Sequence, residues 1–367
     1  MASRGFGPVS VTLSLVLLTT SAAGQPTVRH PTPGPTSPPV GMLGARDGGP
    51  RHITPKVHTA TPTAAIATPP VKDAGRALAA VLPPAPYKVT SYSIRDLAPG
   101  SLPYVSAHLP SKRYVPEYRD ASGIPMKKVG TKLYYSPAGL LQLALRYEDA
   151  YRRTKDQWYL DWAAKIHRKA IALGVASNNG LYIPYRYSFK MHGLATEGMK
   201  APWYSAMAQG LALSLAVRLY RDTGDAGYLT DATKLFNSFR HVGRGPKPWV
   251  TYIDAGRYLW LEEYPGRLTP SDHSANGFFF AVFGLYDYYQ ETRDPWALRI
   301  LRAGMTTMRR HISEYRRPGT YSKYCLRHGK PQAKYHKIVT WQLEFMYKMS
   351  GDPYFLRMSK SFYDDYH

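Results

Sequence analysis

A four-fold internal repeat constrains the fold of this chain more than any other feature of its sequence. Each copy has the pattern Tyr-x-x-(Thr/Ser)-x-Asp, and the copies end at Asp156, Asp225, Asp294 and Asp352. An aspartate of this kind caps a helix, because its carboxylate accepts the free N–H groups of the first turn. Proline follows Asp294 and Asp352 directly and suits the first helical position. Recurrence in four places argues against four unrelated turns.

Each copy of the repeat lies between two stretches with apolar residues at helical spacing. Four antiparallel helix pairs in series predict an all-α fold, namely an α/α barrel (toroid) of about four pairs with short turns at one end. The helices are expected before the repeats at Leu140–Tyr151, Met207–Tyr220, Phe278–Tyr289 and Thr340–Tyr347, and after them at Trp158–Leu173, Tyr228–Phe239, Trp296–His311 and Tyr354–Tyr366.

Three long connections join successive helix pairs and must lie at the opposite end of the barrel. They span approximately residues 174–204, 242–275 and 314–334. Long loops on a rigid scaffold are a usual location for binding and catalytic residues. We expect short β-hairpins in these loops that cover a cleft, at the strand-like runs Leu181–Phe189, Trp249–Asp254 and Thr320–Cys325.

The N-terminal quarter of the chain has a different composition. Residues 1–24 are typical of an export signal, with Arg4, the apolar run Val9–Leu18 and small residues at Ser21–Gly24. An uncleaved anchor is the alternative, although a span needs roughly 20 apolar residues. Residues 25–86 are rich in Pro, Thr and Gly, which predicts an extended disordered linker. The expected organisation is therefore a signal peptide, a linker and a helical domain over 87–367 of a secreted or cell-surface protein.

Composition limits the classes of partner. The 367 residues include 48 Lys+Arg and 25 Asp+Glu, a net charge of +23, and most of this excess lies beyond residue 85. A basic domain favours a polyanionic partner, with general solubility as the alternative explanation. The export signal and the lack of a nucleic-acid-binding module argue against nucleic acid. No membrane contact is expected beyond the signal, and a homodimer is left open.

The single cysteine, Cys325, excludes an intramolecular disulfide framework and a multi-cysteine zinc site. It is most simply a small packed residue. No HExxH-like ligand spacing and no glycine-rich nucleotide motif occurs, so neither a metal nor a cofactor is predicted. Asp272 and His273 are interpreted as the start of a helix without a catalytic role.

The long loops are dense in Tyr, Trp, Arg and Lys. Aromatic rings beside cations suit a charged sugar, because rings stack on pyranose faces and arginine binds carboxylates or sulfates in a fork. Packing is an equally good explanation for any single tyrosine. The predicted substrate-binding residues are Trp203, Tyr204, Gln209, Glu263, Asn276, Arg327 and His336; capping is the alternative for Glu263 and Asn276.

Several motifs follow one another in the region of residues 120–367. They are Pro202–Gly210, Glu263-Tyr264-Pro265, Asn276-Gly277-Phe278 with Gly284–Asp287, Tyr324-x-Leu326-Arg327-His328, and Tyr335-His336 with Gln342-Leu343. In type and order they resemble the C-terminal α-barrel domain of the D-glucuronyl C5-epimerases. The family resemblance implies conversion of D-glucuronate to L-iduronate within an acidic polysaccharide such as a heparosan-type chain. It also implies that Tyr264, Tyr324 and Tyr335 are catalytic, supported by Glu263 and Arg327.

The sequence also departs from the family pattern. Animal members carry β-rich domains before the α-barrel, where this chain has the linker and a short segment over 87–133. Leu261 stands in place of a tyrosine, Cys325 in place of an acidic residue and Val339 in place of a histidine. These departures leave the three tyrosines intact.

Inversion at C5 removes a proton alpha to a carboxylate and returns one from the opposite face, which requires two proton-transfer groups and cationic stabilisation of the enediolate. A free tyrosine has a pKa of about 10. Positive charge from Lys323, Arg327 and His328 is predicted to lower the pKa of Tyr324.

We assign Tyr264 and Tyr335 to opposite faces of the sugar, Tyr324 as partner or relay, and Arg327 and His336 to the carboxylate. Two alternatives stay open: a polysaccharide lyase that cleaves by β-elimination, and an inactive glycan-binding module.

Overall fold

The structure is a computed structural model that describes residues 82–106, 108–194, 196–266 and 271–366. The predicted signal peptide and the predicted linker as far as residue 81 lie outside the described residues. Within the described residues, no helix is both long enough and apolar enough to span a bilayer.

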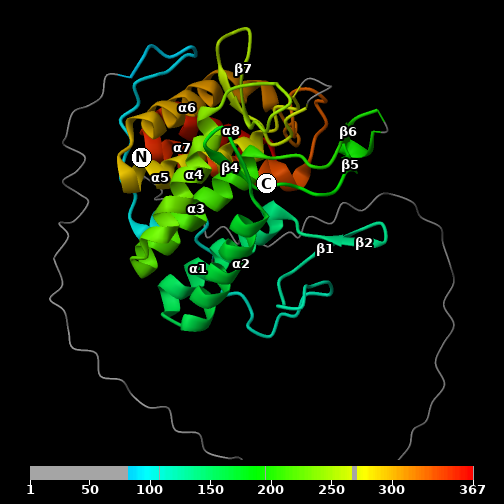
Figure 1. The fold of residues 1–367 in the computed structure, drawn as a ribbon. Helices are drawn as coiled ribbons and strands as arrows, with labels where there is room; N and C mark the ends of the chain where they lie inside the picture. The colour runs from blue at the N-terminus through cyan, green and yellow to red at the C-terminus, as the bar shows by residue number, and fades with distance from the viewer. Residues whose placement is uncertain (1–81, 107, 195, 267–270, 367) are drawn as a thin grey trace, which may run out of the picture. The chain divides into compact units, whose positions relative to one another are not determined.

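Eight α-helices in four antiparallel pairs form the framework of the described residues (Figure 1). The predicted all-α fold and all eight predicted helices are confirmed, with ends that differ by a few residues. Helix α7 differs most, because it begins seven residues before the predicted Thr340. The helices are α1 (Pro137–Thr154), α2 (Gln157–Leu173), α3 (Ala206–Thr223), α4 (Ala226–Arg240), α5 (Ala275–Thr292), α6 (Pro295–Tyr315), α7 (Ala333–Ser350) and α8 (Pro353–Asp365).

The repeated motif forms the same capped turn in every pair, as predicted. Each repeat aspartate is the N-cap of the second helix and accepts the N–H of the residue two positions on. The residue before each aspartate has a left-handed backbone, and its N–H donates to the carbonyl of the repeat tyrosine, which ends the first helix. These left-handed residues are Lys155, Gly224, Arg293 and Gly351.

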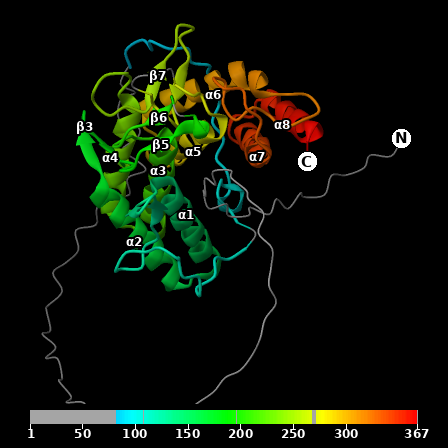
Figure 2. The same cartoon turned by 90° about the vertical axis from the view of Figure 1, so that its right-hand side faces the viewer.

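The pairs are layered as in an α/α barrel. Helices α1, α3, α5 and α7 form an inner layer and pack on one another in chain order, whereas α2, α4, α6 and α8 pack outside them. Helices α1 and α7 lie at the two ends of the inner layer (Figures 1 and 2). Helices α3 and α5 approach most closely where Gly210 meets Gly284, since a Cβ on Gly284 would overlap the Gly210 backbone. Glycine is therefore required at the centre of the inner layer.

Four two-stranded antiparallel hairpins occur in the described residues, one before α1 and three between helices. Two of the predicted strand-like runs contain strands, at β4 and β5 and at β7. The prediction of a strand at 320–325 is wrong: this segment makes only isolated bridges, including Ser274 to Cys325 and Lys323 to Pro331. The pairs are β1 (Lys127–Val129) with β2 (Lys132–Tyr134), β3 (Val175–Ser177) with β4 (Gly180–Tyr182), β5 (Phe189–Lys190) with β6 (Gly198–Met199), and β7 (Thr251–Ile253) with β8 (Leu259–Leu261).

An extended segment, residues 86–106, crosses the short-turn end of the inner layer; we call it the strap. It contains the short 3-10 helix η2 (Pro99–Ser101). A second 3-10 helix, η3 (Met191–Gly193), lies outside the strap, between β5 and β6. The strap contacts every inner helix through hydrogen bonds, and so ties the four pairs together at this end. These bonds are Arg95 N to Met349 O (2.8 Å), Leu97 N to Tyr286 Oη (2.9 Å), Arg218 Nη2 to Pro103 O (2.9 Å) and Ser106 N to Asp149 Oδ2 (3.0 Å).

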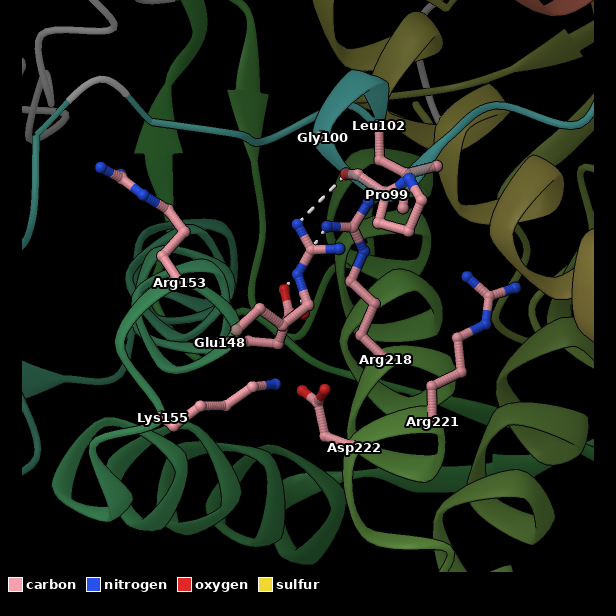
Figure 3. Close-up of a pocket in the computed structure, with 10 residues that line it drawn as sticks. Pro99, Gly100, Leu102, Glu148, Arg153, Lys155, Arg218, Arg221 and Asp222 are labelled. Atoms are coloured by element: carbon pink, nitrogen blue, oxygen red, sulfur yellow. Dashed lines mark hydrogen bonds and ion pairs between the residues drawn. The ribbon is translucent and has the colours of Figure 1, made fainter.

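Arg218 on α3 is the centre of a buried charge network beneath the strap. Its side chain is 2 % exposed, and its Nε lies 3.0 Å from Asp287 Oδ2 and its Nη1 3.4 Å from Glu148 Oε2. Beside it is a cavity of about 470 Å³, which Lys155 and Asp222 also line (Figure 3). The cavity lies at the C-terminal ends of α1 and α3. The long loops are about 27 Å away, the length of an 18-residue helix.

Candidate functional site

Three tyrosines from separate parts of the chain come together at the long-loop end. Tyr264 follows β8, Tyr324 lies between α6 and α7, and Tyr335 lies in the first turn of α7. The hydroxyl oxygens of Tyr264 and Tyr324 are 3.0 Å apart. The ring centroids of Tyr324 and Tyr335 are 4.5 Å apart. The structure thus brings the three predicted catalytic residues into one cluster.

Glu263 extends this cluster into the protein. Its Oε2 accepts hydrogen bonds from Tyr324 Oη (3.2 Å) and Ser274 Oγ (2.5 Å). A Cβ on Gly277 would overlap the same carboxylate, so Gly277 leaves the space in which Glu263 rests on the first turn of α5. The N-terminus of a helix favours an anion there. Because Tyr324 has one hydroxyl proton and donates it to Glu263, Tyr264 is the donor in its contact with Tyr324.

Burial shifts the pKa of each group in this chain of hydrogen bonds upward. Desolvation raises the pKa of Glu263 to about 7, against the opposing effect of hydrogen bonds from Ser274, Tyr264 and Tyr324. Burial, together with the nearby Glu263 charge, raises the pKa values of Tyr264, Tyr324 and Tyr335 well above the usual value. The carboxylate is therefore the group that titrates near neutrality, and all three phenols are protonated there.

The upward shift corrects the prediction that positive neighbours lower the pKa of Tyr324. Arg327 is three residues from Tyr324 in sequence, but its Nη2 lies 2.9 Å from Glu197 Oε1. The Tyr324 hydroxyl instead faces the carboxylate of Glu263. The prediction from sequence proximity was therefore wrong, because the charged group next to the Tyr324 hydroxyl is negative and not positive.

Accessibility differs along the cluster. Tyr264 and Tyr335 are half-buried, whereas Tyr324 is 7 % and Glu263 6 % exposed. The two outer phenols can therefore touch a ligand, with the Tyr324–Glu263 pair behind them.

An aromatic group packs beside Tyr264. The Trp203 ring stacks on Tyr185 with centroids 3.8 Å apart, and lies 5.9 Å from the Tyr264 ring. Phe189 lies 5.7 Å from Tyr264, and Trp203 Nε1 donates to the Tyr187 carbonyl at 2.9 Å. Trp203 was predicted here. Sequence reasoning missed the other three, although their alternate spacing at 185, 187 and 189 on a strand-like run was an available signal.

Comparison with known proteins identifies the family. Residues 177–364 match the sequence profile described as D-glucuronyl C5-epimerase C-terminus. The chain belongs to this epimerase family. All three clustered tyrosines lie inside the matched region, while α1, α2 and the strap precede it.

A relative and two solved structures illustrate what the chain is similar to. The D-glucuronyl C5-epimerase of Caenorhabditis elegans is 34% identical over 94 residues, which is 24% of this chain and 14% of that protein. The match thus spans about a seventh of the relative's length. The cellobiose 2-epimerase of Bacillus thermoamylovorans B4167 is 14% identical, with a TM-score of 0.46 over 62% of this chain and 58% of that one. An unsaturated glucuronyl hydrolase from Streptococcus agalactiae is 12% identical, with a TM-score of 0.42 over 62% and 57%.

In this epimerase-family chain, two of the residues that were predicted to bind substrate instead pack within the fold. Buried Gln209 accepts from Ile183 N (2.8 Å) and donates to Leu181 O (2.7 Å) and Ser238 Oγ (2.8 Å), which fastens β4 to α3 and α4. These bonds use its amide groups, so the prediction of sugar binding by Gln209 is corrected. Tyr204 is also buried and packs on the Tyr182 ring at 5.7 Å.

His336 does not face the tyrosines either. Its Nδ1 accepts from Ser322 N at 2.9 Å, and its Nε2 lies 2.8 and 2.9 Å from the carbonyl oxygens of Phe362 and Tyr366. Both ring nitrogens are therefore engaged with backbone. The prediction that His336 binds the sugar carboxylate is corrected: it joins α7 to the end of α8.

Asn276 lies in the first turn of α5, next to Gly277. The N-cap of α5 is Ser274, so the capping interpretation of Asn276 is wrong. Its side chain is buried, and its Oδ1 has no hydrogen-bond partner among the described residues. This buried acceptor without a partner among the described residues keeps Asn276 among the candidate binding residues.

A lysine that the sequence analysis missed lies beside the third tyrosine. Lys334 Nζ is 5.3 Å from the centre of the Tyr335 ring. Burial lowers the pKa of this half-buried ammonium, and a bound carboxylate would oppose that shift. Its position directly before Tyr335 was the available signal.

A second polar cluster borders the tyrosines, and we call it the histidine cluster. It consists of His192, Asp272, Cys325 and His328, whose nitrogen, oxygen and sulfur atoms lie within 4.8 Å of one another. The sequence analysis assigned no catalytic role to Asp272 and interpreted Cys325 as a packed residue. Only the Cys-x-x-His spacing of 325 and 328 was a local signal, since the other two members are more than fifty residues away.

Proposed function

We propose that this protein inverts C5 of D-glucuronate residues to L-iduronate in an acidic polysaccharide, by proton transfer through tyrosines. The observation that carries the proposal is the continuous chain Tyr264–Tyr324–Glu263, with contacts of 3.0 and 3.2 Å and a terminal carboxyl whose pKa is about 7. A pKa near neutrality suits a group that must both accept and release a proton.

In the first half-reaction, Tyr264 oxygen accepts the C5 proton. A neutral phenol can act as a base only if it loses its own proton at the same time. Tyr264 therefore passes its hydroxyl proton to Tyr324, and Tyr324 passes its own to Glu263. The C5–H bond breaks, a carboxylic acid forms at Glu263, and the negative charge moves to the enediolate of the sugar.

In the second half-reaction, Tyr335 donates its hydroxyl proton to C5 from the opposite face. The Tyr335 phenolate then takes a proton from water, and Glu263 releases one to water through the same relay. This exchange restores the starting state and leaves a solvent hydrogen at C5. Lys334 beside the Tyr335 ring, and Arg327, which is paired with Glu197, are the candidates for holding the sugar carboxylate and the enediolate charge.

The substrate class follows from charge and aromatic content. A net charge of +23 favours a polyanion, and the half-buried ring of Phe189 beside Tyr264 offers a flat surface for a pyranose, with buried Trp203 packed against it. A heparosan-type chain fits both features. The export-like sequence over residues 1–24 would place the reaction outside the cytoplasm.

The test is incubation of the full chain with uronate-containing polysaccharides in deuterated water, followed by NMR at C5. We expect deuterium at C5 and iduronate in the wild type. Tyr264→Phe and Tyr335→Phe should each lose nearly all exchange, while Tyr114→Phe, which changes an exposed tyrosine, should retain it. Near-normal exchange in both site variants would refute the assignment.

The same incubation separates the two other candidates. A lyase would shorten the polymer and leave unsaturated, ultraviolet-absorbing ends, whereas an epimerase leaves chain length unchanged. Binding of the polymer with no deuterium at C5 would identify a glycan-binding module.

A further inference from the structure

We propose that the histidine cluster is a zinc site. His192 comes from η3, Asp272 from the segment before α5, and Cys325 and His328 from the segment between α6 and α7. Four side chains from three separate segments thus present the types of donor atom that zinc binds in proteins, namely imidazole nitrogen, thiolate sulfur and carboxylate oxygen.

The distances fit a tetrahedral ion. Zinc–ligand bonds of about 2.0–2.3 Å place ligand atoms roughly 3–4 Å from one another. Cys325 Sγ lies 3.4 Å from His328 Nδ1 and 3.7 Å from His192 Nε2. His192 Nε2 lies 3.0 Å from Asp272 Oδ2, and His328 Nδ1 lies 2.7 Å from Asp272 Oδ1. The Asp272–His328 contact must open by a few tenths of an ångström or more, and any pair of ligand atoms wider than about 4 Å must close, since the four atoms lie within 4.8 Å of one another.

The donor set selects the metal and its role. A thiolate with two imidazoles favours zinc over magnesium or calcium, which prefer all-oxygen sites. Asp272 and Cys325 are fully buried and the two histidines nearly so, which leaves little room for a water ligand or a substrate. A closed set of four protein ligands is typical of structural zinc.

A carboxylate outside the cluster orients one of its histidines. Glu197 Oε2 lies 2.7 Å from His328 Nε2, and Arg327 Nη2 lies 2.9 Å from Glu197 Oε1. A histidine that binds zinc through one nitrogen commonly holds a carboxylate with the other, which fixes the ring and the tautomer. Glu197 therefore leaves His328 Nδ1 as the ligand atom.

Zinc here would position the catalytic tyrosine. Cys325 follows Tyr324 directly, and the His192 ring is 5.6 Å from the Tyr324 ring. The ion would join the three segments behind the Tyr324–Glu263 contact. Zinc binds cysteine as the thiolate, so its binding releases the thiol proton of Cys325.

The test uses the full, untagged chain stripped with a chelator and dialysed. After zinc is restored and the excess is removed by dialysis, we expect one zinc per chain by elemental analysis and a higher melting temperature than that of the stripped chain. Cobalt in place of zinc should give the charge-transfer absorption of a Co²⁺–thiolate bond, which reports Cys325 directly because the chain has one cysteine. This readout needs no variant and no enzymatic activity.

Variants then locate the ion. Cys325→Ser should abolish the cobalt–thiolate band, and His192→Ala should weaken zinc binding more than about 100-fold. Glu197→Gln should weaken it about 10- to 100-fold, as expected for a residue that orients a ligand. His108→Ala removes an exposed histidine and should change nothing.

Two results would overturn the proposal. Absence of zinc from the chain at micromolar concentrations would show that the four groups are only a hydrogen-bonded network. Zinc that binds without a thiolate band, or as tightly in Cys325→Ser and His192→Ala as in the wild type, would place the ion elsewhere. Neither result bears on the epimerase proposal, since the readout is metal binding and not proton exchange at C5.

Discussion

Replacing Glu263 with glutamine should make the protein more stable and inactive, in a manner that depends on pH. Burial raises the pKa of this carboxyl from 4.5 to about 7. Below pH 4.5 the group is protonated in both the folded and the unfolded chain, and the fold bears no charge penalty. Between pH 4.5 and 7 the unfolded chain ionises this carboxyl while the folded protein keeps it protonated. The unfolding free energy therefore falls by about 3 kcal/mol across this window and levels off above it.

Glu263→Gln removes the charge but keeps an oxygen that can accept from Tyr324 and Ser274. The variant should therefore match the wild type near pH 4.5 and exceed it by up to about 3 kcal/mol above pH 8. The rate of proton exchange at C5 in the wild type should change in the opposite direction from its stability. In the wild type the rate should rise with pH and reach half its plateau near pH 7, because only the carboxylate accepts the relayed proton. The variant should be inactive at every pH.

Urea unfolding of both proteins between pH 4.5 and 9 measures the first effect, and C5 deuterium incorporation over the same range measures the second. Glu344→Gln is the control, because Glu344 is exposed and pairs with Lys348 at 2.8 Å. Its stability difference from the wild type should stay within about 0.5 kcal/mol at all pH values. A stability difference between Glu263→Gln and the wild type that does not change with pH would refute the reasoning, as would an active glutamine variant.

Three further substitutions test the fold and the site. Asp225→Ala removes an N-cap and should lower the unfolding free energy by about 1 kcal/mol in urea, without affecting C5 exchange. Arg218→Met leaves buried Asp287 without its ion pair and Glu148 with Arg152 alone. It should cost about 3–5 kcal/mol at pH 8, and less at pH 5, because burial raises the pKa of Glu148 to about 7 and this carboxyl is then protonated. Gly277→Ala should displace the Glu263 carboxylate and abolish C5 exchange, which deuterium NMR measures; unchanged exchange would mean that the carboxylate does not need this position.

The helix pairs could be predicted because their signals are local. Each repeat aspartate caps a helix only two residues away, and each left-handed residue before it ends the preceding helix. The start of α7 could not be found in this way. Residues 333–339 include two lysines and a histidine, so their apolar pattern is weak, and it is packing against α8 that makes them helical.

The site was only partly predictable, since motif order located the tyrosines but not the partners of the other side chains. The ring of His336 is held by backbone groups 14 to 30 residues away. Nothing near His336 in sequence marks those contacts. The histidine cluster was missed for the same reason, because its members approach one another only when three loops fold onto the end of the inner layer.

The raised pKa values of the tyrosines are compatible with the proposed proton transfer, because in that mechanism the proton is finally accepted by Glu263 and no phenolate is needed beforehand. Burial raises the pKa of Tyr264 and of Tyr335 alike, so both rest as neutral phenols. The negative charge that the proposed reaction needs is held at Glu263, behind the outer phenols, at a cost in stability. The position of one carboxylate, held against Gly277, thus accounts both for the basicity of the site and for its pH dependence.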